Sequence, residues 1–131
     1  MKHALVALLV LASLLCAANQ KRKSPKPPEV EVIEATARRA QRIVTLDGRV
    51  RNSGERPAQG LTLLFSMMAP GGQVITTQKG TIEEQVLEPG EEAEFHWQMK
   101  DPVRAVDFKI DAVDGNGRDL MVRKAGPYPI E

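Results

Sequence analysis

Cysteine is almost absent from this chain of 131 residues, in which Cys16 is the single example. Cys16 lies within an apolar run near the N-terminus, so the other residues hold no thiol for a disulfide or a cysteine-ligated metal. A domain built from those residues must be stabilised by side-chain packing and hydrogen bonds alone.

Histidine is nearly as scarce, and of the two in the chain only His96 lies beyond the N-terminal region. A hydrolase needs a nucleophile with a base, or paired acids around a cleft. Ser66 is expected on the same outward phase as His96, but no third group is placed to orient such a pair. The sequence therefore predicts a protein that is not an enzyme and holds no cofactor.

Charge of one sign is also lacking, because 18 Lys and Arg residues oppose 17 Asp and Glu residues. From Glu29 onward the chain has 13 basic and 17 acidic residues, so this part is weakly acidic. Binding to nucleic acid relies on a basic face that attracts phosphates. We therefore expect no nucleic-acid partner.

Long hydrophobic runs are limited to residues 4–18, which hold fourteen apolar residues and one serine behind the cation of Lys2. A membrane-spanning helix needs roughly 20 apolar residues, and this run is shorter. A short apolar run that follows a positive charge and ends in small residues is typical of a secretory signal peptide. We predict a signal peptide over residues 1–18, cut after Ala18, and an exported protein that is periplasmic or extracellular.

Two alternative interpretations keep residues 4–18 at a membrane. In the first, Cys16 is lipidated as in bacterial lipoproteins, although Leu15 stands where that motif has Gly, Ala or Ser. In the second, the run is an uncleaved anchor, because the cations of Lys21-Arg22-Lys23 resist export. In both cases membrane contact is expected through the N-terminus alone.

Residues 19–28 combine three prolines and four cations with no apolar residue. Such a segment has nothing to bury, and its prolines favour an extended chain. We predict a linker over residues 19–28 and a single folded domain over residues 29–131, which have the length of one ordinary domain.

From Val30 onward, apolar residues alternate with polar ones between turns rich in glycine and proline. The clearest case is residues 93–100, in which every odd position is apolar and every even position is polar. A period of two is typical of strands with one buried face. Six or seven such segments predict an all-β fold, either an antiparallel β-sandwich or a small barrel such as an OB-fold.

Several segments carry local expectations. Val30–Arg42 is the place where a short helix competes with a strand. Gly48 predicts a bulge or a close backbone approach. Gly80 is expected to end an edge strand over Gln73–Lys79. Asp114–Asp119 is expected to be a hairpin turn rather than a calcium loop, because Arg118 replaces an oxygen ligand.

The order of several short motifs resembles a known family. These motifs are Gly48–Gly54 (GRVRNSG), Leu61–Phe65 (LTLLF), Gly71–Val74 (GGQV), Leu87–Glu91 (LEPGE) and Phe95. Together they resemble the FxLYD-type domains of bacterial envelope proteins over roughly residues 30–113. The resemblance implies an exported, immunoglobulin-like β-sandwich of about seven strands without catalytic activity. It further implies a role in binding or envelope assembly, with another envelope protein as the expected partner.

Soft metal ligands suggest a different function, a periplasmic carrier of a small ligand or of copper. The candidate ligands are Met67, Met68, His96, Met99 and Met121. Met67 and Met99 share the inward phase, so only Met68 and His96 are left to meet at the surface. Methionine as core filler is the simpler interpretation, and we expect no metal site.

A partly apolar strip on the outer phase of one strand is the candidate partner surface. It consists of Thr62, Leu64, Ser66 and Met68. An apolar stripe on a polar sheet can bind a partner protein. The alternative is that the linker or the tail Pro127–Ile130 covers this strip in the folded protein.

Overall fold

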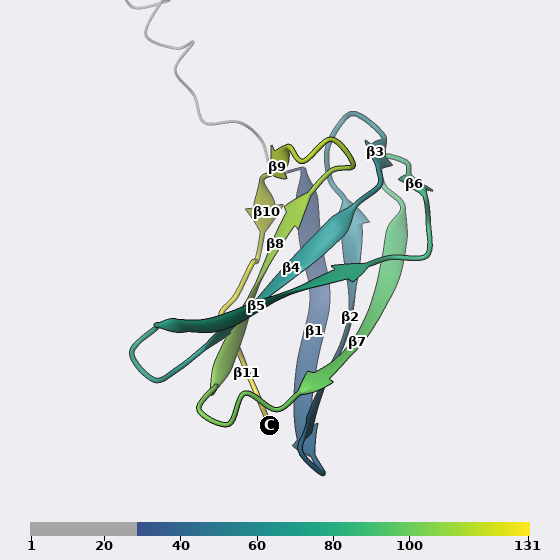
Figure 1. Ribbon diagram of the computed structural model, residues 1–131. Helices are drawn as coiled ribbons and strands as arrows, with labels where there is room; N and C mark the ends of the chain where they lie inside the picture. The colour runs from purple at the N-terminus through teal and green to yellow at the C-terminus, as the bar shows by residue number, and fades with distance from the viewer. Residues whose placement is uncertain (1–28) are drawn as a thin grey trace, which may run out of the picture.

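The computed structural model describes residues 29–131 of the chain. The signal peptide predicted over residues 1–18, with Cys16, and the linker predicted over residues 19–28 lie outside the described residues. The described residues form strands and turns without a helix, and the strands build two sheets packed face to face (Figure 1). None of residues 29–131 belongs to a helix able to cross a membrane.

The first sheet has the strand order β10-β1-β2-β7. Its strands are β1 (Val30–Ala40), β2 (Ile43–Asn52), β7 (Glu92–Lys100) and β10 (Val122–Arg123). β1 and β2 form a long antiparallel hairpin, and β7 pairs antiparallel with the other side of β2. β10 pairs in parallel with β1, an exception to the predicted antiparallel pattern.

The second sheet has the order β11-β8-β4-β5, and β9 also pairs with β8. Its strands are β4 (Thr62–Met68), β5 (Val74–Thr81), β8 (Asp107–Val113), β9 (Asp119–Leu120) and β11 (Tyr128–Pro129). A separate short ribbon joins β3 (Ala58–Gln59) to β6 (Val86–Leu87).

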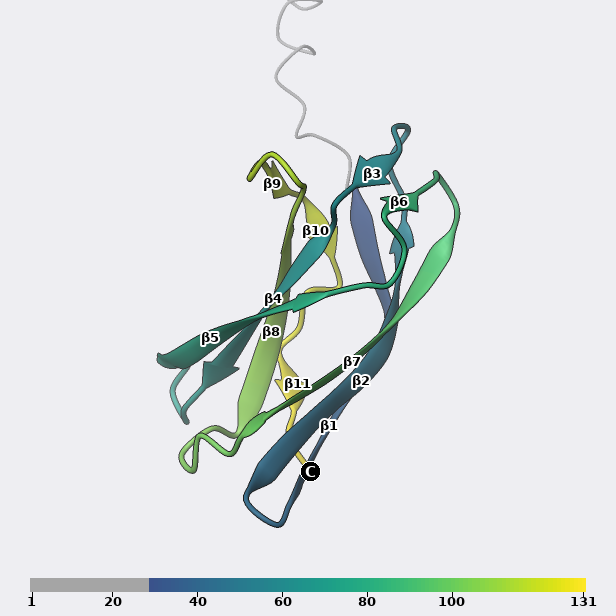
Figure 2. The same cartoon turned by 45° about the vertical axis from the view of Figure 1, so that its right-hand side comes forward.

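The predicted immunoglobulin-like β-sandwich is confirmed. Six strands of seven or more residues carry the two sheets, three strands of two residues extend them, and the other two short strands form the separate β3–β6 ribbon. The alternative prediction of a small closed barrel is wrong, because β5 and β7 each end a sheet instead of pairing with one another. Figure 2 shows both of these strands along one open side of the sandwich.

The core lies between the two sheets and is filled by the inward phase of each strand, as the alternation predicts. Phe65 of β4 and Phe95 of β7 meet across it, with ring centroids 5.4 Å apart. The rings of Phe108 on β8 and Tyr128 also pack together, with centroids 5.5 Å apart. Trp97 packs against this core and is only partly buried, because its strand β7 ends the first sheet.

One local alternative is settled by the structure, and one local expectation is wrong. Residues 30–40 are strand β1 with no helical turn, and the hairpin that follows places Gln41 and Arg42 at positive φ, 52° and 67°. Gly80 lies inside β5, which continues to Thr81, instead of ending it. A β-carbon at position 80 would come within 2.8 Å of the Phe65 ring, so packing explains this glycine.

Asn52 at the end of β2 fixes the turn that follows it. Its side chain is buried, and its Nδ2 donates to the carbonyls of Arg56 and Leu87, each at 2.8 Å. Its Oδ1 accepts a hydrogen bond from the Gly54 amide at 2.9 Å. The turn at Asn52-Ser53-Gly54 is therefore joined to the strand ends around it.

Candidate partner-binding surface

The outer face of the second sheet is built around β4, which lies between β5 and β8. Leu64 projects from β4 on this face and is half-buried by its neighbours. In register it stands between Lys79 of β5 and Asp111 of β8, so an aliphatic side chain separates a cation from an anion. Two residues further along β4, on the same face, the Ser66 hydroxyl lies 3.3 Å from the Thr77 hydroxyl.

The four residues of the predicted strip do not share one environment. Thr62, Leu64 and Ser66 are half-buried on the outer face, whereas Met68 is only 6% exposed. Met68 lies between Val74 of β5 and Asp107 of β8 in register. The strip therefore offers three residues to a partner, because Met68 is buried.

The tail does not cover this face. Tyr128 and Pro129 form β11 at the edge of the same sheet, paired with β8. The Ile130 amide then donates to the Val106 carbonyl at 2.9 Å, and Ile130 also forms a bridge with Ala37 of β1. The hypothesis that Pro127–Ile130 lies over the strip is wrong. In Figure 1 the sheet stands in front of β1 and β2, with no other described strand across it.

β5 forms the free edge beside this face, as predicted, with bounds Val74–Thr81 in place of Gln73–Lys79. A bulge shifts the β4–β5 register near Met68, and Ile75 is the additional residue. Val74 is 58% exposed and Ile75 is 41% exposed. An unpaired edge can accept a strand from another protein, and here it carries two exposed aliphatic side chains.

His96 and Ser66, which the sequence placed on the same outward phase, do not meet. Each of them lies on the outer face of its own sheet, and the two faces point away from each other. The partner of His96 is Asp47 of β2, whose Oδ1 lies 2.5 Å from Nδ1 of the ring. Both side chains are more than half exposed, and this pair has no nucleophile bonded to it among the described residues.

The methionines also fail to form the metal site considered above. Met67 is fully buried and Met99 is 8% exposed, so both act as core filler. Met68 and His96 belong to opposite sheets and cannot meet at the surface. Within residues 29–131, no group of three or more His, Cys, Asp and Glu side chains is placed to hold a metal ion.

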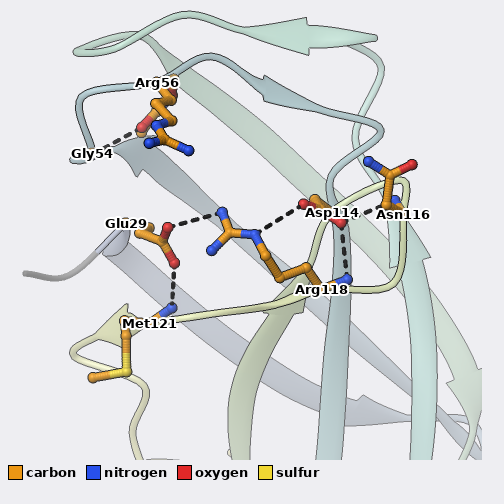
Figure 3. Close-up of polar contacts among 8 residues, drawn as sticks. Glu29, Gly54, Arg56, Asp114, Asn116, Arg118 and Met121 are labelled. Carbon is orange, nitrogen blue, oxygen red and sulfur yellow. Dashed lines mark hydrogen bonds and ion pairs between the residues drawn. The ribbon is translucent and has the colours of Figure 1, made fainter. Parts of the chain in front are cut away.

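The Asp114–Asp119 segment is a turn held by its own aspartate. The Asp114 carboxylate accepts hydrogen bonds from the amides of Asn116 and Arg118, both at 2.9 Å (Figure 3). The bond from the Arg118 amide is the main reason that the pKa of Asp114 lies below its usual value. Arg118 also bonds Glu29 at 2.9 Å, which ties the start of the domain to this turn.

A groove of about 810 Å³ lies between this turn and the loop that follows β2. The carboxylates of Glu29 and Asp114 are both bonded to Arg118 there, and Glu29 also accepts from the Met121 amide at 3.1 Å (Figure 3). Because these charges are paired within the domain, the groove offers less to a charged ligand than its residue types suggest.

Glu31 is a buried carboxylate that the sequence did not single out. Its side chain is 8% exposed and pairs with Arg51, while Lys124 lies 3.5 Å and Arg123 lies 3.9 Å from Oε2. Burial alone would raise its pKa, but the hydrogen bond and charge of Arg51, with Lys124, hold the pKa below the usual value. This cluster joins β10 to β1 and β2 and has a structural role.

No family model and no curated protein matches the sequence. Among solved structures, IrmA from Escherichia coli is 14% identical, with a TM-score of 0.47 over 78% of this chain and 95% of IrmA. ApaA from Bordetella pertussis is 21% identical, with a TM-score of 0.46 over 74% of this chain and 89% of ApaA. A calcium-binding mutant of β-glucuronidase 2 from Bacteroides uniformis is 18% identical at a TM-score of 0.47, and 12% of its chain is covered.

Proposed function

We propose that this protein is an exported, non-catalytic module that binds another envelope protein, in recognition or in envelope assembly. The observation that carries the proposal is the outer face of the β8-β4-β5 sheet, which no segment of residues 29–131 covers. On this face Leu64 is half-buried between Lys79 and Asp111, and the outer edge of strand β5 beside it pairs with no strand of residues 29–131. The resemblance to FxLYD-type domains of the bacterial envelope points to the same role.

The chemistry of this face suits a protein partner. An aliphatic side chain bordered by one cation and one anion can be buried by a partner while the charges remain at the rim. The free edge of β5 adds unpaired backbone groups that an extended segment of the partner can bond. The His96–Asp47 pair lies on the other sheet and is not part of this surface.

The test is whether the native protein loses its partner when this face is changed. We would isolate the full chain from gently solubilised envelopes of its host and measure its native mass, for the unchanged protein, Leu64→Asp and Thr45→Asp. Thr45 is a matched control, because it is half-buried on the outer face of the other sheet. We expect a complex with unchanged protein and Thr45→Asp, and its loss with Leu64→Asp. Equal loss in both variants, or no complex in any, would contradict the proposal.

A further inference from the structure

Exposed aliphatic side chains gather at the end of the sandwich that lies away from the start of β1. Residues 29–131 have seven large hydrophobic side chains that are exposed, and five of them lie in or directly beside three connections at this end. They are Ile43, Val74, Ile75, Val103 and Val106. Figure 2 shows these connections, the β1–β2 turn, the β4–β5 hairpin and the β7–β8 loop, toward the lower end of the molecule.

The connections are bonded to one another and form one surface. The Asp101 amide donates to the Arg42 carbonyl at 2.9 Å, which joins the β7–β8 loop to the β1–β2 turn. The Arg39 guanidinium donates to the Asp101 carboxylate at 2.8 Å and to the Ala105 carbonyl at 2.7 Å. The Val106 amide bonds the end of β4. Aliphatic side chains on these turns are therefore held in fixed positions.

Exposed cations lie in or beside the same connections as Ile43, Val103 and Val106. They are Arg38, Arg42, Lys100 and Arg104, and none of them forms an ion pair within residues 29–131. We call these four cations with Ile43, Val103 and Val106 the far-end patch. On these connections, at the strand ends that flank them and at the C-terminus, five cations (Arg38, Arg39, Arg42, Lys100 and Arg104) oppose three carboxylates (Asp101, Asp107 and Glu131). In the remainder of residues 29–131, eight cations oppose fourteen carboxylates.

The shape of the patch favours binding to a deformable surface over binding of a ligand in a pocket. Val103 is 82% exposed on its loop, so it projects from the molecule instead of lining a hollow. Aliphatic side chains that project among Arg and Lys are the arrangement that enters the headgroup region of an anionic bilayer. The cations are attracted to lipid phosphates, and their apolar stems lie along the acyl boundary.

We infer that the far-end patch docks on the surface of an anionic lipid membrane. The inference goes beyond the proposed protein-binding function and uses a different part of the molecule. The acidic remainder of the domain is repelled by the same lipid surface, so the domain approaches with this end first. The outer face around Leu64 stays free in that orientation, and membrane docking and partner binding are separable.

A fluorescent probe at position 103 tests the inference. The full chain, as its host exports it, would carry Val103→Cys in a Cys16→Ser background, so that the introduced thiol is the one labelled. A second protein would carry the label at Ser66→Cys on the outer face. Vesicles of phosphatidylglycerol and phosphatidylethanolamine with brominated acyl chains would be compared with vesicles of phosphatidylcholine. The probe reads local contact, so attachment through residues 1–28 does not mimic the result.

We expect the bromines to quench the label at position 103 in anionic vesicles alone, with the label at position 66 unaffected. Each of Arg42→Gln, Lys100→Gln and Arg104→Gln should weaken the docking about five-fold, because one cation near an anionic surface contributes on that scale. Salt at several times physiological strength should release the domain. Leu64→Asp should leave the quenching unchanged.

Equal responses at positions 103 and 66, or equal quenching in neutral vesicles, would overturn the inference. A label at position 103 that is shielded only when a protein partner is added would also overturn it, and would assign the patch to protein contact. Lys79→Gln is the matched control for the charge variants, because it removes a cation from β5 outside the patch. The circular dichroism of each variant would be compared with that of the parent to establish that it is folded.

Discussion

The phenyl ring of Phe95 lies against Gly48, so closely that a β-carbon at position 48 would stand 2.4 Å from its Cζ atom. The same carbon would stand 2.2 Å from the carbonyl oxygen of Glu34 on the neighbouring strand. β2 thus has room for neither a side chain nor a shift at this point, since backbone blocks one side and a core ring the other. The close approach expected from the sequence is confirmed, and the bulge lies on β1 instead, between Val32 and Glu34.

Gly48→Ala should therefore destabilise the domain. We expect the free energy of unfolding to fall by about 3 kcal/mol, as for overpacked cores. Urea unfolding followed by far-UV circular dichroism measures the change. Gly54→Ala is the matched control, because its added carbon would meet nothing nearer than 3.4 Å. Equal stability of the two variants would show that the Phe95 ring moves aside freely.

Asn52→Ala should also destabilise the domain, because it removes three hydrogen bonds at once. The Leu87 carbonyl that accepts from Asn52 is buried and would lose this bond. A buried polar group left without its bond costs about 1–3 kcal/mol, so we expect a loss of about 3 kcal/mol in total. Thermal unfolding checks this, with Asn116→Ala in the exposed turn as the control. A loss in Asn52→Ala no larger than in the control would mean that water replaces the bonds.

Glu31 should make stability depend on pH in acid. Because its pKa is lower in the folded chain than when unfolded, its ion pairs stabilise the fold above the usual glutamate pKa of about 4.3. That contribution is lost as pH falls through the lower, folded value. The difference in unfolding free energy between the parent and Glu31→Gln should be constant from pH 7 to pH 5 and shrink in stronger acid.

Denaturant titrations at several pH values measure that difference. Arg51, Arg123 and Lys124 are the charged groups that face Glu31, and all three stay protonated over this range. A difference that stays constant to pH 3 would contradict the assignment. Glu94→Gln, an exposed carboxylate on β7, is the control for a general charge effect.

Met68→Asp and Leu64→Asp should differ although both lie on the outer phase of β4. Met68 is buried, so a carboxylate there costs several kcal/mol and lowers the melting temperature by ten degrees or more. Leu64 is half-buried at the surface, and its replacement should change stability by about 1 kcal/mol. Differential scanning calorimetry separates the two. A large loss in both would mean that the face is core rather than surface.

The sequence predicted the strands well where alternation is regular. β7 follows its pattern from Ala93 to Met99 with only Trp97 partly exposed, because burial on one face is what the period of two encodes. The sequence wrongly predicted that Gly80 ends its strand. Gly80 lies inside β5, and its lack of a side chain leaves room for the Phe65 ring. The packing of a ring from the neighbouring strand decides such a position, and the alternation of one strand does not reveal it.

Much of the surface could be assigned only from the structure. The strip Thr62, Leu64, Ser66 was placed on the outer face by its phase, but the same phase put Met68 there as well. Met68 is nevertheless buried, at the point where a bulge shifts the β4–β5 register and the Val106 amide bonds the Met68 carbonyl. The far-end patch was invisible in the sequence, since three connections far apart along the chain come together only in the fold.

Site-specific photocrosslinking in the host tests the central claim, that the outer face of the β8-β4-β5 sheet contacts a protein partner. A photoreactive residue would replace Ser66 in one strain and Thr45, on the other sheet, in a second. We predict that irradiation joins the protein covalently to one discrete envelope protein from position 66 and not from position 45. The same product from both positions, or none from position 66 while the chain is folded and exported, would contradict the account.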